Sequence, residues 1–127
     1  MKTQPNAINW FEIPVDDFER AKMFYSRIFD YEMPEMAMGS SRMGMFVVDQ
    51  AAGHVGGAIV KVDDFLPSRH GTLAYLNAGE DLSTILMRVE DAGGRVLQDK
   101  TEITPEFGYY ATFLDSEGNK VALHSPK

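Results

Sequence analysis

Hydrophobic residues recur along this chain at two different periods, and the change of period outlines its first elements. Residues 8–15 combine aromatic and β-branched side chains, which is typical of a strand, and Pro14 stands near its end. Asp16 and Asp17 suit the start of a helix. From there the apolar residues follow helical spacing, at Phe18, Ala21, Phe24, Tyr25, Ile28 and Phe29. The sequence therefore predicts a strand followed by a helix.

Three further strands are predicted before the middle of the chain, at about residues 31–36, 43–49 and 57–62. Two segments rich in turn residues, 39–41 and 50–56, separate them. Residues 65–71 form a connector. The first half therefore has the order strand, helix, three strands.

The same order begins again after the connector. Residues 72–78 predict a strand, and Asp81 opens a helix that Gly93 and Gly94 end. Strands follow at about 95–100, 109–114 and 120–125, and residues 115–119 form a turn between the last two. One face of the predicted helix carries Leu82, Ile85, Leu86, Val89 and Ala92.

The two halves match at a fixed offset, which places Asp17 on Asp81 and Ala58 on Ala122. Few residues are identical between the halves, so the repeat is one of pattern. We therefore expect an α+β fold built from two βαβββ units.

Composition narrows the classes of partner. The net charge is −7, which disfavours nucleic acid and anionic membranes as partners. No apolar run reaches the roughly 20 residues that cross a bilayer, and the first ten residues lack the apolar core of a signal peptide. The chain has no cysteine, so a disulfide, a thiolate metal site and a cysteine nucleophile are excluded. We expect a cytoplasmic protein whose partner is a small molecule, another protein or a second copy.

Three segments resemble one known family. The segment Phe11–Tyr25 (FEIPVDDFERAKMFY) is similar to the opening of glyoxalase/bleomycin-resistance/dioxygenase domains, the vicinal oxygen chelate superfamily. The segment Gly108–Asn119 (GYYATFLDSEGN), followed by residues 123–125, resembles the family's closing hairpin. Residues 73–76 with Gly93 and Gly94 match the start of its second module. The resemblance covers residues 8–125.

The resemblance implies a single domain over residues 1–127. Module one spans about 8–63, a linker 64–71 and module two about 72–125. Each module forms a curved half-sheet, the two together enclose a cavity, and the helices lie outside. Members of the family often form homodimers, so we expect one here, with modules paired within one chain or between two.

Metal-dependent members of the family draw one ligand from the first and the fourth strand of each module. Carried over to this chain, those positions fall on Trp10, Ala58, Ala74 and Ala122. None of these side chains binds a divalent metal, which needs oxygen, imidazole nitrogen or thiolate. We therefore expect no cofactor, and a divalent metal is disfavoured.

Residues two apart on a strand share a face, so the ligand positions identify the expected lining of the cavity. Ile8 and Glu12 are expected on the face of Trp10, and Thr72 and Leu76 on the face of Ala74. Val60 is expected on the face of Ala58, and Lys120 and His124 on the face of Ala122.

Two polar residues of this lining are catalytic candidates. Glu12 and His124 could together move a proton. The alternative is structural, with Glu12 bound to a backbone amide or to Arg42 and with His124 exposed near the chain end. His54 and His70 lie in predicted loops and are expected at the surface.

Five methionines lie between residues 33 and 45, and core filling is one explanation for them. The other is a pliable wall for an apolar ligand, because methionine adapts its shape readily. In that interpretation Trp10, Tyr75, Met43 and Met45 bind the ligand.

Three functions remain open. The first is a metal-independent module that binds a partly apolar small molecule, and the second a glyoxalase-related lyase or isomerase that uses Glu12 and His124 or an unusual metal site. The third is a regulatory or structural dimer whose cavity is filled by Trp10 and the methionines. The P-loop, Gly-x-Ser-x-Gly, Gly-x-Gly-x-x-Gly and His-Glu-x-x-His motifs are absent from the sequence.

Overall fold

The computed structural model contains two sheets of four strands, and in each half a helix follows the first strand. It describes residues 2–127 apart from the side chain of Gln50. The first half contains β1 (Trp10–Pro14), α1 (Phe18–Phe29), β2 (Glu35–Met38), β3 (Ser41–Met45), the short 3-10 helix η1 (Gln50–Ala52) and β4 (Gly56–Lys61). The second contains β5 (Tyr75–Asn77), α2 (Ser83–Leu86), β6 (Arg95–Thr104), β7 (Gly108–Leu114) and β8 (Lys120–Ser125).

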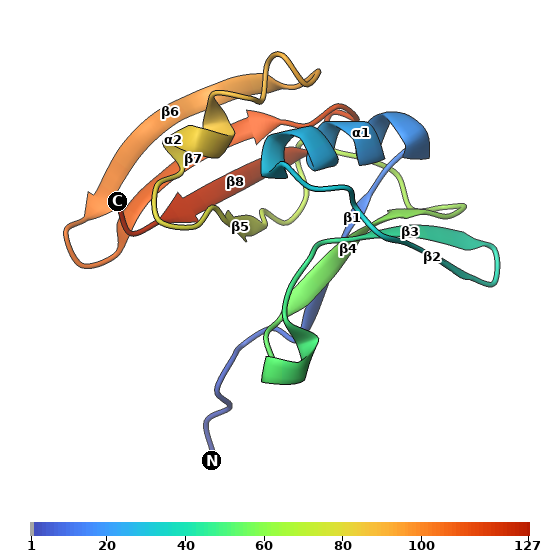
Figure 1. The fold of residues 1–127 in the computed structure, drawn as a ribbon, viewed down its shortest axis with the longest axis horizontal. Coiled ribbons are helices and arrows are strands. Elements are labelled where there is room, and N and C mark those ends of the chain that lie inside the picture. The colour runs from blue at the N-terminus through green and yellow to red at the C-terminus, as the bar shows by residue number, and fades with distance from the viewer. Residues whose placement is uncertain (1) are drawn as a thin grey trace.

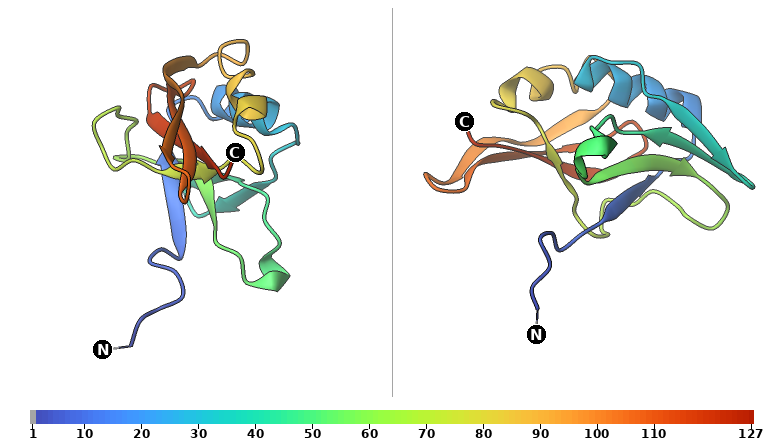
Figure 2. Two further views of the ribbon diagram at one scale, coloured as in Figure 1. Left: turned by 90° about the vertical axis from the view of Figure 1, so that its left-hand side faces the viewer. Right: turned by 60° about the horizontal axis from the view of Figure 1, so that its bottom comes forward.

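The two sheets have the same topology. Sheet A has the strand order β1-β4-β3-β2, and sheet B has the order β5-β8-β7-β6. In each sheet the first and last strands of the unit are parallel and the remaining pairs are antiparallel. Both helices lie on the same side of the sheets (Figures 1 and 2). The predicted α+β fold of two βαβββ units is therefore confirmed, as two open curved sheets.

The helix α1 has the predicted bounds and the predicted cap. The Asp17 carboxylate accepts the backbone N–H of Arg20, which satisfies one of the free donors at the helix start. Asp30 ends the helix in the left-handed conformation, with φ of 59°. The buried residues of α1 are Phe18, Ala21, Phe24, Tyr25 and Ile28.

The second helix is much shorter than its apolar pattern predicts. Leu82, Ile85 and Val89 are buried as expected. The α-helical hydrogen bonds nevertheless stop early, because the amides of Arg88 and Val89 bond to carbonyls three residues back. The chain continues in turns to Gly93, whose φ is 110°. Apolar spacing thus identified the buried face correctly and overestimated the regular helix.

Several strand boundaries also differ from the prediction. β2 and β3 lie closer to their shared turn at Gly39, where φ is +60°. β6 extends to Thr104, four residues further than predicted. The pairing of β6 with β7 contains register shifts, which interrupt the regular alternation on which the prediction relied.

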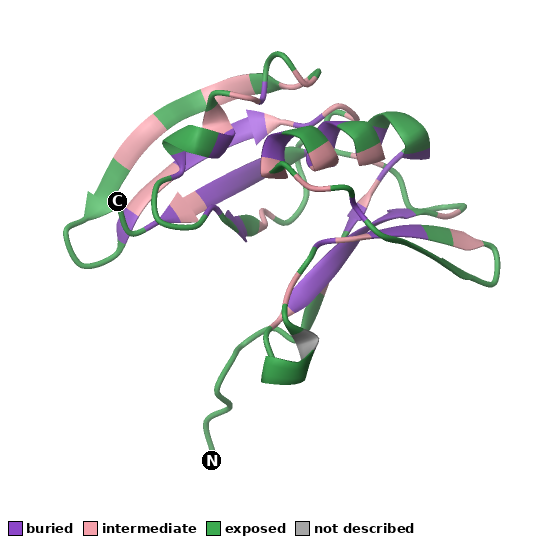
Figure 3. Cartoon of the chain, viewed as in Figure 1, coloured by how far each residue is buried: buried purple, intermediate pink, exposed green. Residues whose placement is uncertain are grey.

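One apolar core joins the two halves on the helix side of both sheets. Phe24 of α1 packs against Phe113 of β7, with ring centroids 5.8 Å apart. The same cluster contains Ile13 and Val15 from the first half and Leu123 from the last strand. Figure 3 shows the buried residues concentrated in β4, β7, β8 and the inner side of α1. Within residues 2–127, no helix has the length and apolarity of a membrane-spanning segment.

Candidate functional site

Sheet A has one face toward the main core, and its opposite face carries a second, smaller apolar cluster. On β1, the side chains of Phe11 and Ile13 pack in the core, whereas Trp10 and Glu12 point to the opposite side. Register places Ala58 of β4 beside Glu12, and Met43 of β3 beside Val60. We call this side the open face of sheet A; its residues are Trp10, Glu12, Met36, Met38, Met43, Met45, Ala58 and Val60.

Three of these residues form a small cluster separate from the main core. Met43, Ala58 and Val60 are buried together, and Met45 packs against them with partial exposure. Met33 instead belongs to the main core. Met33 therefore fills the core as one explanation expected, whereas Met43 and Met45 lie on the open face of sheet A.

Trp10 lies on the same face and is 37% exposed. Its indole N–H donates to Glu12 Oε2 over 3.3 Å. The ring lies beside Gly56 of β4, where a Cβ atom would be 3.5 Å from Cζ3. A Cβ there would be in ordinary contact with the indole and closer, at 3.0 Å, to Cγ2 of Val48.

Sheet B likewise has a face opposite the main core. It carries Tyr75 of β5, Tyr110 and Thr112 of β7, and Lys120, Ala122 and His124 of β8. Tyr75 and Tyr110 contact one another with ring centroids 6.4 Å apart, and Tyr75 is 54% exposed. This set is the open face of sheet B.

The expectation that Leu76 lines the cavity is wrong. Leu76 is 4% exposed and belongs to the main core. Register pairs Tyr75, not Ala74, with Ala122. A shift of one residue turns every side chain of a strand to the other face, so the offset between the halves misassigned β5.

Few side chains on these two faces carry an atom that can coordinate a metal ion. Ala58 and Ala122 offer no donor atom, and Trp10 offers only an N–H. Glu12 is the single carboxylate on the open face of sheet A. Within residues 2–127 no group of three or more histidine, cysteine, aspartate or glutamate side chains is placed to hold a metal ion.

Glu12 and His124 lie on different sheets, and no hydrogen bond joins them within the described residues. The Nε2 atom of His124 is 2.6 Å from the carbonyl oxygen of Phe107, to which a protonated Nε2 donates. That contact leaves Nδ1 for other partners. His54 and His70 are both exposed, as predicted.

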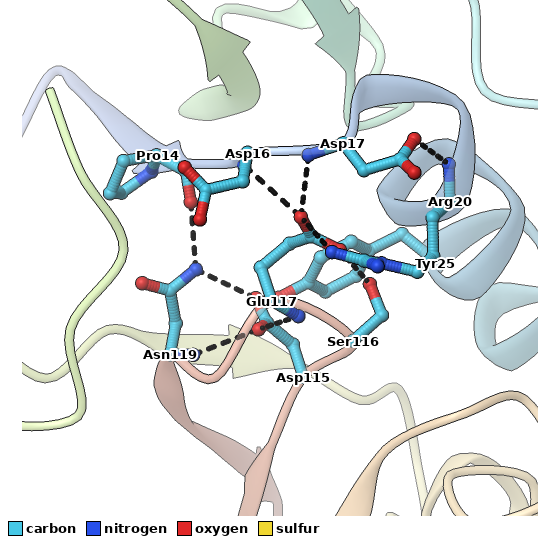
Figure 4. A network of polar contacts seen from close by, with 9 residues as sticks. All are labelled: Pro14, Asp16, Asp17, Arg20, Tyr25, Asp115, Ser116, Glu117 and Asn119. Atoms are coloured by element: carbon cyan, nitrogen blue, oxygen red, sulfur yellow. Dashed lines mark hydrogen bonds and ion pairs between the residues drawn. The ribbon is translucent and has the colours of Figure 1, made fainter.

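A polar cluster that the sequence analysis treated only as a turn connects the halves (Figure 4). Asp115, after β7, accepts hydrogen bonds from Tyr25 Oη at 2.7 Å and from Asn119 Nδ2 at 3.0 Å. Asn119 Nδ2 also donates to the carbonyl of Pro14 in β1. The turn therefore fixes the end of β1 and the side of α1 from the opposite half.

Glu117 of the same turn lies at the start of α1. Its carboxylate accepts the backbone N–H groups of Asp16 and Asp17, at 3.0 and 2.7 Å, and both Nε and Nη2 of Arg20. An anion at this position also suits the positive end of the helix dipole. We call Tyr25, Asp115, Glu117 and Asn119 the clasp. The sequence signal for this cluster was the presence of aspartate, glutamate and asparagine in one turn. The sequence near the turn does not show which distant residues these side chains bind.

The electrostatics of the clasp differ between its two carboxylates. Burial raises the pKa of Asp115, and the hydrogen bonds from Asn119 and Tyr25 partly oppose this. Burial also acts to raise the pKa of Glu117, but Arg20 and the Asp17 amide outweigh it, so this pKa is lowered. Desolvation and the neighbouring Asp115 raise the pKa of the fully buried Tyr25 well above its ordinary value. The phenol is therefore a hydrogen-bond donor across the whole range of neutral pH.

Two shallow hollows lie on the helix side of the molecule, away from the open faces. One, of about 560 Å³, follows α1 from Glu19 to Glu32. The other, of about 410 Å³, lies between α2 and β6 and includes Met87 and Val96. Neither contains Trp10, Tyr75 or a residue of the clasp; the candidate ligand-binding residues lie instead on the open faces.

The match to a family model decides the family. The model of the Glyoxalase/Bleomycin resistance protein/Dioxygenase superfamily matches residues 7–123. The chain belongs to this superfamily. A relative from Didymella fabae, described as a glyoxylase-like domain-containing protein, is 32% identical over 119 residues, which is 91% of either chain. The resemblance of the three sequence segments to vicinal oxygen chelate proteins is thereby confirmed.

Solved structures of the superfamily share the fold. A glyoxalase/bleomycin resistance protein from Albidiferax ferrireducens superimposes with a TM-score of 0.69 at 17% identity, covering 93% of this chain and 97% of that one. The antibiotic binding protein TnmS3 from a Streptomyces species gives 0.65 at 22% identity, covering 99% and 100%. The fosfomycin resistance protein FosX from Listeria monocytogenes gives 0.62 at 16% identity, covering 98% and 94%.

Proposed function

We propose that this member of the superfamily is a metal-independent binding protein for a partly apolar small molecule. The observation that carries the proposal is the open face of sheet A, where Trp10, Met43 and Met45 surround Ala58 at a position that metal-dependent relatives use for a ligand. An aromatic ring and polarisable thioethers suit an apolar guest. Binding is also what TnmS3, which shares the fold, is named for.

A screen of metabolites and antibiotics tests this function. The readout is the fluorescence of Trp10, which is the single tryptophan of the chain, together with the melting temperature. A ligand present at 100 times its Kd stabilises the folded state by about 2.7 kcal/mol. We expect at least one compound to change both signals equally with and without chelator.

The site of binding is tested with a matched pair of variants. Met45→Lys places a charge on the open face of sheet A and should abolish the response to the compound. Met23→Lys changes a methionine on the outer side of α1 that is 62% exposed, and should leave binding intact. Equal loss in both variants, or none in either, would place the ligand elsewhere and refute the assignment.

We also propose that two copies form a homodimer that meets at Met36, Met38 and Tyr75 and leaves the ligand site at Trp10 and Met45 accessible. These three large apolar side chains are exposed, and such patches mark interaction surfaces. Light scattering after gel filtration would measure the mass, and Met38→Glu should lower it toward that of one chain. A wild-type mass equal to one chain would contradict the dimer. Cytoplasmic location remains our expectation and is tested by cell fractionation.

A second candidate is a lyase or isomerase that uses Glu12 and His124. The observation in its favour is that both side chains lie on the open face of their sheet. Turnover of a bound compound, lost in both Glu12→Gln and His124→Ala while its affinity is retained, would support catalysis. Binding without turnover in the wild type would leave the binding protein as the function.

A further inference from the structure

The charged residues of sheet A are sorted between its two faces. Arg42 of β3 points to the helix side, where its guanidinium lies 4.2 Å from the centroid of the Phe18 ring and pairs with Glu19 and Glu35. Register places Lys61 of β4 opposite Arg42, on that same side. Glu12 is the one ionisable side chain on the open face. The open face of sheet A therefore presents an anion and no cation of its own.

The carboxylate of Glu12 lacks a cationic partner within the described residues. Its hydrogen bond comes from the neutral indole of Trp10, and no ion pair reaches it in residues 2–127. Three other carboxylates of this half, those of Glu19, Glu32 and Glu35, lie within 4 Å of a lysine or arginine nitrogen. Glu12 is thus free to receive a positive charge from outside the chain.

The surroundings of Glu12 favour a particular kind of cation. The indole beside it offers a π face, on which organic cations rest favourably. Met45, which is partly exposed and packs on the buried Met43, offers a soft apolar surface on the same side of the sheet, which suits carbon-rich groups and repels a strongly hydrated ion. The net charge of −7 raises the local concentration of any cation. One carboxylate without further oxygen donors does not suit a hard metal ion.

We infer that the open face of sheet A selects an organic cation, whose alkylated ammonium or delocalised cationic group contacts Trp10 and pairs with Glu12 while its apolar part packs on Met45. This inference rests on the proposed binding function and narrows it to one class of ligand. It assigns Glu12 to charge recognition, a role that requires no proton transfer and no contact with His124.

Three probes of equal size but different charge test the inference. Phenyltrimethylammonium is the cation, tert-butylbenzene is its neutral isostere, and benzoate is an anion of similar extent. The fluorescence of Trp10 reports binding at the site itself. We expect the cation to bind about tenfold more tightly than the neutral probe, since a cation–π contact and a partly exposed ion pair act together. Benzoate should bind most weakly.

The Glu12→Gln variant separates charge from shape, because the amide keeps the size of the side chain. We expect it to remove the preference for the cation and to leave the affinity for the neutral probe unchanged. Glu32→Gln, which alters a carboxylate with 88% exposure beyond the end of α1, is the matched control and should keep the tenfold preference. Added salt should reduce the preference in the wild type and have no effect in Glu12→Gln.

The possible outcomes distinguish a failure of cation selection from a failure of the proposed small-molecule binding. Equal affinity for the cation and the neutral probe, or a preference that survives in Glu12→Gln, overturns cation selection and leaves an apolar binding face. A preference for benzoate overturns it as well. If no probe changes the fluorescence of Trp10 and the wider compound screen also yields no ligand for this face, the proposed function fails together with the inference.

Discussion

The phenol of Tyr25, in α1, donates a 2.7 Å hydrogen bond to Oδ2 of Asp115, 90 residues later in the chain. Both residues are buried, and the Asp115 carboxylate also accepts the backbone N–H groups of Glu117 and Asn119 at 2.9 Å. Four donors thus converge on one carboxylate between the two halves. Because each half contributes, the clasp fixes how the first sheet lies relative to the second.

Removing the Tyr25 hydroxyl should therefore weaken the whole fold. Tyr25→Phe keeps the aromatic packing against Phe24 and Phe46 but loses a hydrogen bond to a charged group, at a cost of about 1.5–3 kcal/mol. Urea denaturation measures the free energy of unfolding. Tyr109→Phe is the control, because its hydroxyl makes only a 3.3 Å contact with Glu102 at the surface. Equal losses in the two variants would show that Tyr25 has no special structural role.

Glu117 should make stability depend on pH in the acid range. Its folded-state pKa is lowered from the ordinary value of 4.5, so the unfolded state binds more protons as pH falls. Its contribution is therefore present above pH 4.5 and is lost as the pH falls through the folded-state pKa. Glu117→Gln should be less stable than the wild type at pH 7, and the difference should shrink below pH 4.5.

Unfolding free energies measured from pH 3 to pH 7 test this, with Glu32→Gln as the matched control. The carboxylate of Glu32 is 88% exposed and has only a 3.8 Å contact with Lys22. Its variant should follow the wild-type curve. A constant gap between Glu117→Gln and the wild type at every pH would assign the loss to packing rather than to the charge.

Gly94, between α2 and β6, should not accept a side chain. A Cβ there would lie 2.6 Å from the backbone carbonyl oxygen of Leu114 and 2.7 Å from the Phe24 ring. Gly94→Ala should therefore destabilise the protein by about 1–3 kcal/mol, as overpacking of a core does. Gly71→Ala adds the same methyl group where no atom lies within 4 Å, and thermal unfolding should show little change. A stable Gly94→Ala would mean that the halves separate easily at this point.

If the protein functions without a metal, a chelator should leave its melting temperature unchanged. We expect EDTA, and then added Zn²⁺, Ni²⁺, Mn²⁺ or Mg²⁺, to cause no shift in the melting temperature, because Trp10, Ala58 and Ala122 supply no ligand atoms. Tight binding would stabilise the fold by several kcal/mol at saturating metal. Such a shift, lost in Glu12→Gln, would disprove metal independence and revive the enzymatic alternative.

Local patterns in the sequence predicted much of the fold. The bounds of α1 and its Asp17 cap were predictable because both depend on residues within one turn of helix. β8 was predicted to the residue, since a strong turn precedes it. On the open face of sheet A, simple alternation placed Trp10, Glu12 and Ala58 correctly.

Prediction failed where several weak preferences competed. In α2 the apolar spacing continued to Ala92, but tight turns replaced the helix after Leu86. On β5 an alignment of the halves that was one residue out assigned Leu76 to the wrong face. In both places the outcome depends on packing against distant residues, which a local pattern does not contain.

The sequence by itself determined the two βαβββ units and the family, because both follow from residue types at short range. The tertiary structure decided that Tyr25, Asp115 and Asn119 meet across the halves, and that Glu12 lies on an apolar face without a cation beside it. These relationships arise only when strands pair and halves pack, since hydrogen bonds and burial act between atoms in space whatever their separation along the chain.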